Sequence, residues 1–100
     1  MKFEIAPQAR LDLIEIGDYL ERVAGKRTAR RRVERIQTRA HRLKRQPYTG
    51  AEDAELGGRR RVVVAPYLVV YRVTADTVRI ARIVHSARDL PPLFAGEDED

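Results

Sequence analysis

The chain has 100 residues, of which 43% are hydrophobic and 35% are charged, a composition that suits one domain and leaves little room for a second core. The absence of cysteine excludes disulfides and thiolate metal sites and agrees with a cytoplasmic location. No apolar run approaches the roughly 18 residues that a membrane-spanning helix needs, and the chain starts without a signal-peptide pattern.

The charge of the chain is unevenly distributed. The formal net charge is +5, but four of the 15 acidic residues are the last four, so the preceding part carries 20 basic against 11 acidic side chains, a net +9. Seventeen of the basic residues are arginines, which bind phosphates and carboxylates through a planar guanidinium. This body suits a nucleic-acid partner or an acidic protein partner, although a GC-rich genome also favours arginine over lysine.

The first half of the chain predicts a strand and two helices. Residues 2–5 form a short strand candidate, and Pro7 is placed to begin a helix, where its missing N–H has no partner to lose. Asp12 and Glu15 lie early in this helix, where its dipole favours negative charge, and Gly25 is a candidate for its C-terminal cap. A single apolar stripe follows helical spacing at Ala9, Leu13, Ile16, Leu20 and Val23.

The second predicted helix starts from Thr28 as N-cap and ends near Gln46-Pro47, and with the first it makes an antiparallel hairpin. Its apolar stripe consists of Ala29, Val33, Ile36, Ala40 and Leu43. The opposite face carries Arg30, Arg31, Arg35, Arg39, Arg42 and Arg45. Such a face is either a nucleic-acid contact or a solvated helix surface, and the sequence leaves both interpretations open.

Three strands and two turns are predicted between residues 59 and 85, after a loop over residues 48–58. The apolar runs at 62–64, 68–73 and 78–84 are rich in β-branched residues, and Pro66-Tyr67 and Ala75-Asp76 mark the turns. The imperfect alternation of the third run favours a sheet with one face on the helices and the other partly open. The fold class is therefore α+β: a short strand, a helical hairpin and a three-stranded antiparallel meander.

The C-terminal segment continues the domain and then becomes acidic. Pro91-Pro92 forbid a regular helix or a central strand, and the neighbouring Leu90, Leu93 and Phe94 are expected to pack on the body or on a partner. We expect one domain over residues 1–94 and a disordered acidic tail over 95–100. His41 and His85 lie on different elements, so the sequence predicts no metal site, and it contains no cofactor motif.

Four local patterns, in order, resemble the RelE/ParE superfamily of bacterial toxins. The first is Pro7 with its helical stripe through Tyr19-Leu20, and the second is Leu56-Gly57 before a basic strand. The other two are the strand at 67–73 and the exit at 83–89, which reads IVHSARD and is frequent in the ParE branch. The resemblance covers residues 1–94.

This resemblance implies a toxin of a type II toxin–antitoxin pair. Its partner would be a ParD-like antitoxin whose acidic C-terminal segment folds over the basic toxin, in a heterotetramer or a larger complex. RelE-like members cut messenger RNA on the ribosome with arginine, lysine and tyrosine or histidine side chains. ParE-like members lack that set and are linked to inhibition of DNA gyrase.

The ParE-like alternative is favoured by two departures from the RelE pattern. Leu68 stands where those nucleases often have arginine, and no tyrosine follows His85. The partner-binding residues that we expect are Arg59, Arg60, Arg61, Tyr71, Arg72, His85, Arg88, Leu90, Leu93 and Phe94.

The ribonuclease alternative would use some of the same residues as a catalytic site. They are Arg60, Arg61, Tyr71, His85 and Arg88. Histidine is a residue type that can move protons near neutral pH, but His85 can equally be a neutral histidine that fixes the exit turn by hydrogen bonding. A third hypothesis is a folded chain that binds the antitoxin without being toxic. For the free toxin, we expect partial exposure of Leu90, Leu93 and Phe94.

Overall fold

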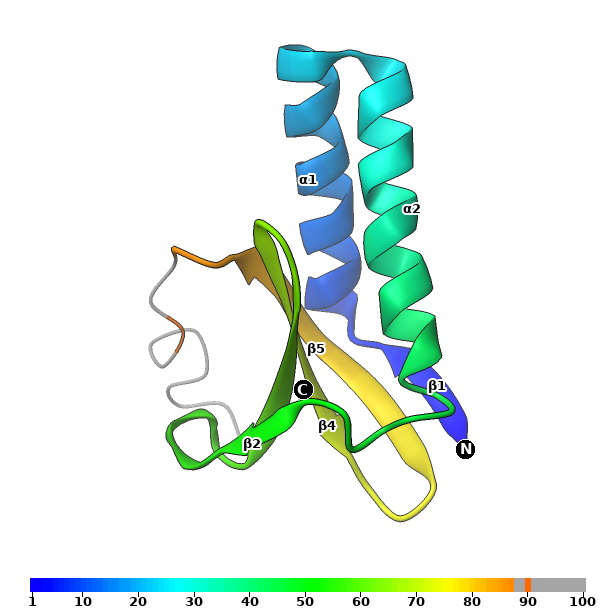
Figure 1. Ribbon diagram of the computed structural model, residues 1–100, viewed down its shortest axis with the longest axis vertical. Helices are drawn as coiled ribbons and strands as arrows, with labels where there is room; N and C mark the ends of the chain where they lie inside the picture. The colour runs from blue at the N-terminus through cyan, green and yellow to red at the C-terminus, as the bar shows by residue number, and fades with distance from the viewer. Residues whose placement is uncertain (88–89, 91–100) are drawn as a thin grey trace.

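The computed structural model describes residues 1–87 and Leu90, and Figure 1 shows a helical hairpin packed against one face of a single sheet. This arrangement confirms the predicted α+β class. The elements, in chain order, are β1 Lys2–Ile5, α1 Pro7–Ala24, α2 Lys26–Arg42, β2 Ala51–Asp53, the 3-10 helix η1 Ala54–Leu56, β3 Arg59–Val64, β4 Tyr67–Val73 and β5 Thr77–His85. None of the described helices is long and apolar enough to cross a membrane.

The two helices are joined by a single glycine. Pro7 opens α1 as predicted, and Gly25 follows its last residue with φ of 90°, a conformation that favours glycine. The N–H of Gly25 donates to the carbonyl of Glu21 at 3.1 Å, and its own carbonyl accepts from the N–H of Ala29 at 3.0 Å. Gly25 therefore ends α1 and begins α2, so the prediction of Thr28 as the N-cap was wrong.

A buried ion pair fastens α1 to the sheet. The prediction that Asp12 and Glu15 serve the helix dipole was wrong, because the first turn of α1 contains no acidic residue. The Asp12 carboxylate instead accepts hydrogen bonds from Arg82 Nε and Nη2 at 2.9 and 3.1 Å, and from the backbone N–H of Ile83 at 2.9 Å. Charge-assisted bidentate pairs of this kind are strong and directional, so they fix α1 against β5.

The sheet has five strands in the order β1-β5-β4-β3-β2, with β1 parallel to β5 and the other pairs antiparallel. The predicted loop over 48–58 therefore contains a strand and a 3-10 helix that sequence reasoning missed. Cross-strand ion pairs support β2, since Glu52 lies 3.8 Å from Arg60 and Asp53 lies 3.9 Å from Arg61. Three residues are too few to show a strand period, which explains the omission.

A bulge in β5 explains the imperfect alternation of its sequence. Val70 pairs with Arg82 but Tyr71 pairs with Ile80, so Ala81 is an extra residue between them. Beyond the bulge the side chains exchange faces. The N-terminal end of the neighbouring strand also differs from the prediction, because β4 begins at Tyr67 and the turn is formed by residues 65–66.

Buried residues occur on both faces of the sheet. The main core lies between the sheet and the helices, and a second cluster lies on the opposite face and consists of Leu56, Leu68, Val70, Ala81, Val84 and Leu90. The expectation of a partly open second face was therefore wrong over this area, because Leu56 of η1 and Leu90 cover the strands there.

Candidate functional site

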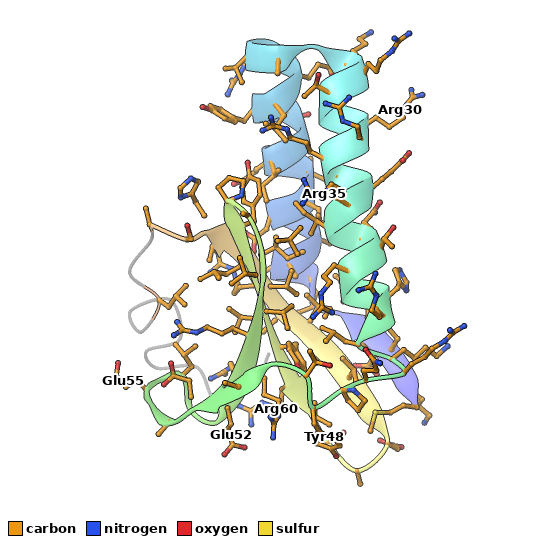
Figure 2. All side chains as sticks on the ribbon, viewed as in Figure 1. Arg30, Arg35, Tyr48, Glu52, Glu55 and Arg60 are labelled. Atoms are coloured by element: carbon orange, nitrogen blue, oxygen red, sulfur yellow. The ribbon has the colours of Figure 1, made fainter. Side chains whose placement is uncertain are left out.

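The side chain of Tyr71, a residue of β4, contacts the loop that joins α2 to β2. Its side chain is fully buried, and its hydroxyl donates to the carbonyl of Pro47 at 2.8 Å and accepts from the N–H of Gly50 at 2.9 Å. Arg60 completes the arrangement: Nη1 donates to the carbonyl of Gly50 at 2.8 Å, and the guanidinium lies 5.1 Å from the ring centroid of Tyr48 (Figure 2). The tyrosine predicted as a binding or catalytic group thus anchors a loop.

The environment of Tyr71 raises the pKa of its phenol. Burial is the largest cause, and it is partly opposed by the N–H of Gly50 and by the positive charges of Arg60 and Arg39. The tyrosine therefore remains protonated at neutral pH and donates its proton to Pro47. A phenol held in its neutral form, with both hydrogen-bonding directions occupied, is poorly suited to act as a general base.

Removing this hydroxyl is expected to destabilise the fold. Tyr71→Phe leaves the carbonyl of Pro47 and the N–H of Gly50 without their partner, so we expect a loss of about 1–3 kcal/mol. The protonated phenol contributes stability fully below the unfolded pKa of about 10. That contribution is lost as pH rises through the higher folded pKa, because the unfolded chain releases its proton first.

Urea unfolding at pH 8 and pH 11 measures both effects. The wild-type chain should lose more stability than Tyr71→Phe over this interval, since only the wild-type chain carries the buried phenol. Equal losses in the two proteins would show that the phenol titrates alike in the folded and unfolded states.

The remaining predicted arginines have separate surroundings. Arg59 is 3% exposed and donates from Nη1 to the carbonyl of Leu56 at 2.8 Å, so it supports η1. Arg61 is exposed, and its guanidinium lies 3.9 Å from the carboxylate of Asp53 in β2. Arg72 is partly buried in β4, where its register partner is Arg79 of β5. The structure therefore distributes the basic strand over different contacts and brings only Arg60 to Tyr71.

His85 lies at the exit of β5, far along the strand from the Tyr71 cluster. Its Nδ1 accepts the N–H of Ala87 at 3.1 Å, and its ring meets Tyr67 edge-on with centroids 5.9 Å apart. The hydrogen bond to Ala87 agrees with the interpretation of His85 as a histidine that fixes the exit turn. A small groove of about 290 Å³ beside it includes Asp12 and Tyr19 of α1.

The last four predicted residues lie at the C-terminal end. Leu90 is 5% exposed within the second cluster, so the expectation of its partial exposure in the free toxin was wrong. Arg88, Leu93 and Phe94, together with the predicted tail over 95–100, lie outside the described residues.

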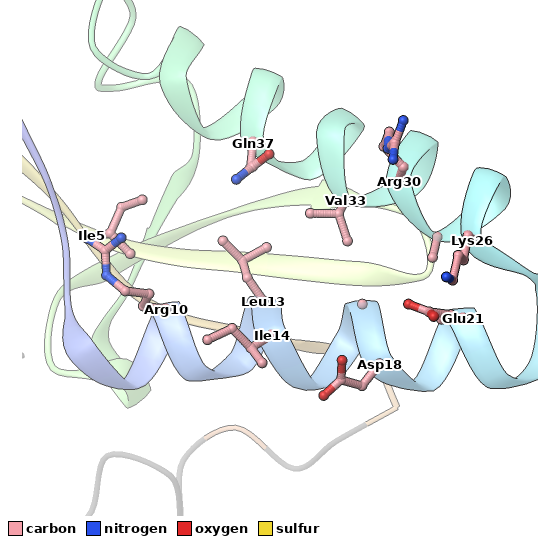
Figure 3. A pocket seen from close by; sticks show the side chains of 12 residues that line it. Ile5, Arg10, Leu13, Ile14, Asp18, Glu21, Lys26, Arg30, Val33 and Gln37 are labelled. Atoms are coloured by element: carbon pink, nitrogen blue, oxygen red, sulfur yellow. The ribbon is translucent and has the colours of Figure 1, made fainter.

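The helical hairpin presents apolar side chains to solvent. Leu11, Ile14, Tyr19 and Val23 of α1 are between 50% and 60% exposed. A groove of about 500 Å³ runs between α1 and α2, with Leu13 and Val33 inside it and the charged residues Glu21 and Lys26 at one end (Figure 3). Exposed apolar side chains of this kind are typical of interaction surfaces, and helical spacing in the sequence already indicates that Leu11 and Ile14 widen the apolar stripe of α1.

The described residues include no group of three histidine, aspartate or glutamate side chains that could hold a metal ion.

Sequence reasoning missed the contact of Asp12 with Arg82 because Arg82 lies 70 positions away in the sequence, and no local pattern joins the two residues. The Tyr71 contacts were missed for the same reason, since Pro47 and Gly50 precede it by more than 20 residues.

Comparisons with known proteins agree with the fold. The family model described as "ParE toxin of type II toxin-antitoxin system, parDE" matches residues 3–90. A solved structure titled "Chromosomal ParDE TA system from P. aeruginosa" matches with a TM-score of 0.77 and 25% sequence identity, covering 85% of this chain and 95% of that chain. A search among curated protein sequences found no match.

Proposed function

The chain belongs to the ParE toxin family of type II toxin–antitoxin systems, and from that premise we propose that it inhibits DNA gyrase by binding. On this proposal it acts in the cytoplasm, and a ParD-like antitoxin neutralises it by direct contact. The similar solved structure is titled as a ParDE system, which supports a heteromeric complex, for which we propose a heterotetramer or a larger assembly.

The surroundings of Tyr71 are the observation that most favours a function in binding over one in catalysis. The ribonuclease alternative needs Tyr71 or His85 to move protons and the arginines to meet a phosphate. Tyr71 is instead fully buried and hydrogen bonded on both sides, and Arg60 is bonded to the same loop. His85 lies beside Tyr67 at the other end of β4, because the register pairs those two residues. These placements support a toxin that acts by blocking another protein.

The surface supports a partner that combines apolar and acidic contacts. The exposed apolar residues of α1 and the groove between the helices suit an amphipathic segment. The net positive charge of the chain complements an acidic antitoxin. A partner that orders on binding covers such an extended surface at the cost of its own conformational entropy.

Purified toxin and gyrase test the proposal directly. We expect the toxin to inhibit supercoiling of relaxed plasmid, and stoichiometric antitoxin to restore it. The Tyr71→Phe variant is used under conditions in which unfolding measurements show it to be folded. It should inhibit gyrase as the wild-type chain does, because the hydroxyl of Tyr71 serves to hold the loop. Messenger RNA on translating ribosomes, assayed with the same preparations, should remain intact.

Two results would contradict the proposal. Undiminished supercoiling at saturating toxin would exclude gyrase as the target. Cleavage of ribosome-bound messenger RNA that Tyr71→Phe or His85→Ala abolishes, while the variant remains folded, would establish the ribonuclease alternative.

A further inference from the structure

Among the residues that the structure describes, no strand pairs with the outer edge of β3 beyond Arg61. β2 pairs with residues 59–61 only, and beyond them β3 continues to Val64. The chain departs from the line of β2 at Gly50, whose N–H donates to the hydroxyl of Tyr71. The segment before β2 therefore does not extend along β3, and the edge beside Val63 meets no described strand.

The register shows which backbone groups face this edge. Ser86 donates its N–H to the carbonyl of Pro66 at 2.8 Å, so alternate β4 residues beginning with Leu68 bond to β5, and Tyr67, Val69 and Tyr71 bond to β3. Their register partners in β3 are residues 64, 62 and 60. The N–H and carbonyl of Val63 consequently point the other way, towards the free edge, and Val63 is 66% exposed.

A row of arginines from α2 lies beside this edge. Two adjoining grooves of about 600 and 470 Å³ separate α2 from residues 63–67, and both include Arg31 and Arg35. The remaining basic residues that line them are Arg32, Arg39 and Arg42, against a single acid, Glu34. We call these five arginines the arginine row. At 1.5 Å per residue, the row from Arg31 to Arg42 is about 16 Å long, the length of about five residues in an extended chain.

The arginine row lacks anionic partners among the residues that the structure describes. None of its five side chains forms one of the ion pairs found there. Arg39 Nη1 is buried, and none of the described residues accepts a hydrogen bond from it. Buried donors are nearly always bonded. Arg35 lies near the middle of α2 (Figure 2).

We propose that the groove between α2 and β3 binds an acidic, extended segment of the antitoxin. The segment adds a strand to the free edge at Val63, in line with β2, and alternate carboxylate side chains meet the arginine row. The inference rests on the proposed antitoxin partnership and specifies which surface the acidic part of that partner occupies. Strand addition supplies affinity through backbone bonds, and the arginines supply the preference for an acidic sequence.

The backbone edge favours a peptide over a nucleic acid. A phosphate backbone would use the arginines and accept from the N–H of Val63, but it offers no donor to the carbonyl of Val63 and would place the apolar side chain against a polyanion. A peptide strand pairs with both backbone groups and presents alternate side chains to the two faces of the sheet. The groove thus combines the two features that recognise an acidic strand.

Variants of the toxin in complex with its antitoxin test the inference. Val63→Pro removes the outward N–H while leaving the bonds to β4 in place, and Val63→Ala is the control that keeps this N–H. We expect Val63→Pro to weaken the complex at least tenfold and Val63→Ala less than threefold. Arg35→Glu should weaken it at least tenfold and flatten its salt dependence, whereas Arg27→Glu, the same charge change on the same helix outside the groove, should have little effect.

The outcomes separate this inference from the proposed function. If the wild-type toxin does not bind the antitoxin, the partnership itself fails. If wild-type binding is tight and both Val63→Pro and Arg35→Glu retain it, the partnership stands and the groove assignment is overturned. A labelled 20-base-pair DNA duplex serves as a competitor probe: binding that Arg35→Glu abolishes, with an unchanged antitoxin complex, would make the groove a nucleic-acid surface instead.

Discussion

Replacing Asp12 by alanine is expected to lower the free energy of unfolding by about 3–5 kcal/mol, the range for breaking a buried ion pair by removing one partner. The change removes the bidentate carboxylate from Arg82 and the acceptor from the N–H of Ile83. The Asp12 and Arg82 side chains are only 6% and 12% exposed, so water replaces these contacts poorly. Denaturant unfolding followed by circular dichroism measures the loss.

An exposed pair of equal length provides the matched control. Arg79 Nη1 lies 2.9 Å from Glu4, the same distance as in the buried pair, but the side chains of Arg79 and Glu4 are 31% and 49% exposed. We expect Glu4→Ala to cost about 0–1 kcal/mol. The double variant Asp12→Ala/Arg82→Met should lose less than the sum of its single changes. A loss for Asp12→Ala no larger than that for Glu4→Ala would show that the pair does not fasten α1 to the sheet.

Replacing Gly50 by alanine is expected to be nearly as damaging, at about 2–3 kcal/mol, the upper part of the range for overpacking. An added Cβ would lie 2.5 Å from the carbonyl oxygen of Arg61 and 2.8 Å from the hydroxyl of Tyr71. The first of these atoms belongs to the backbone and cannot rotate away. The substitution therefore forces the loop off the sheet and weakens both hydrogen bonds of Tyr71.

Gly17 offers the contrasting substitution within the same chain. It lies inside α1, and an added Cβ would meet only Val33 Cγ2 at 3.6 Å, an ordinary contact. Gly17→Ala should therefore raise the stability by about 0.5–1 kcal/mol through helix propensity. Thermal unfolding of both variants compares the two glycines, and a Gly50→Ala protein as stable as Gly17→Ala would contradict the close approach at Gly50.

The elements that sequence reasoning predicted correctly have local causes. Proline at position 7 fixes the backbone where α1 begins, Gly25 has the conformation that ends it, and the β-branched runs of the meander prefer strands irrespective of what they contact. The helical hairpin follows from two stripes whose period is legible within each helix. These features are set by residues that are neighbours in the chain.

The features that escaped prediction depend on residues far apart in sequence. β2 is a strand because its backbone pairs with residues 59–61 of β3, and Ala81 forms a bulge because Tyr71 pairs with Ile80. Neither pairing produces a periodic pattern in the sequence. A partly open second face was predicted from alternation, but Leu90 and Leu56 cover part of it from outside the meander.

The candidate site shows the same limit. Sequence reasoning selected Tyr71, Arg60 and His85 because those residue types perform chemistry on phosphates. The fold separates His85 from the other two and gives Tyr71 a buried, structural position. Residue type alone cannot distinguish a tyrosine that holds a loop from one that meets a substrate, since the distinction lies in burial and partners. The partner-binding role of the predicted residues remains a proposal.

Induction of this chain in bacteria, with and without its antitoxin, is the measurement that tests the central claim most directly. Growth, DNA breaks and protein synthesis are followed together from the moment of induction. Inhibition of gyrase predicts arrest with DNA breaks while early translation continues, and relief of both effects by the antitoxin. Immediate loss of translation with intact DNA would contradict that account and identify the ribosome as the target. Undisturbed growth with folded protein present would show that the chain is not toxic.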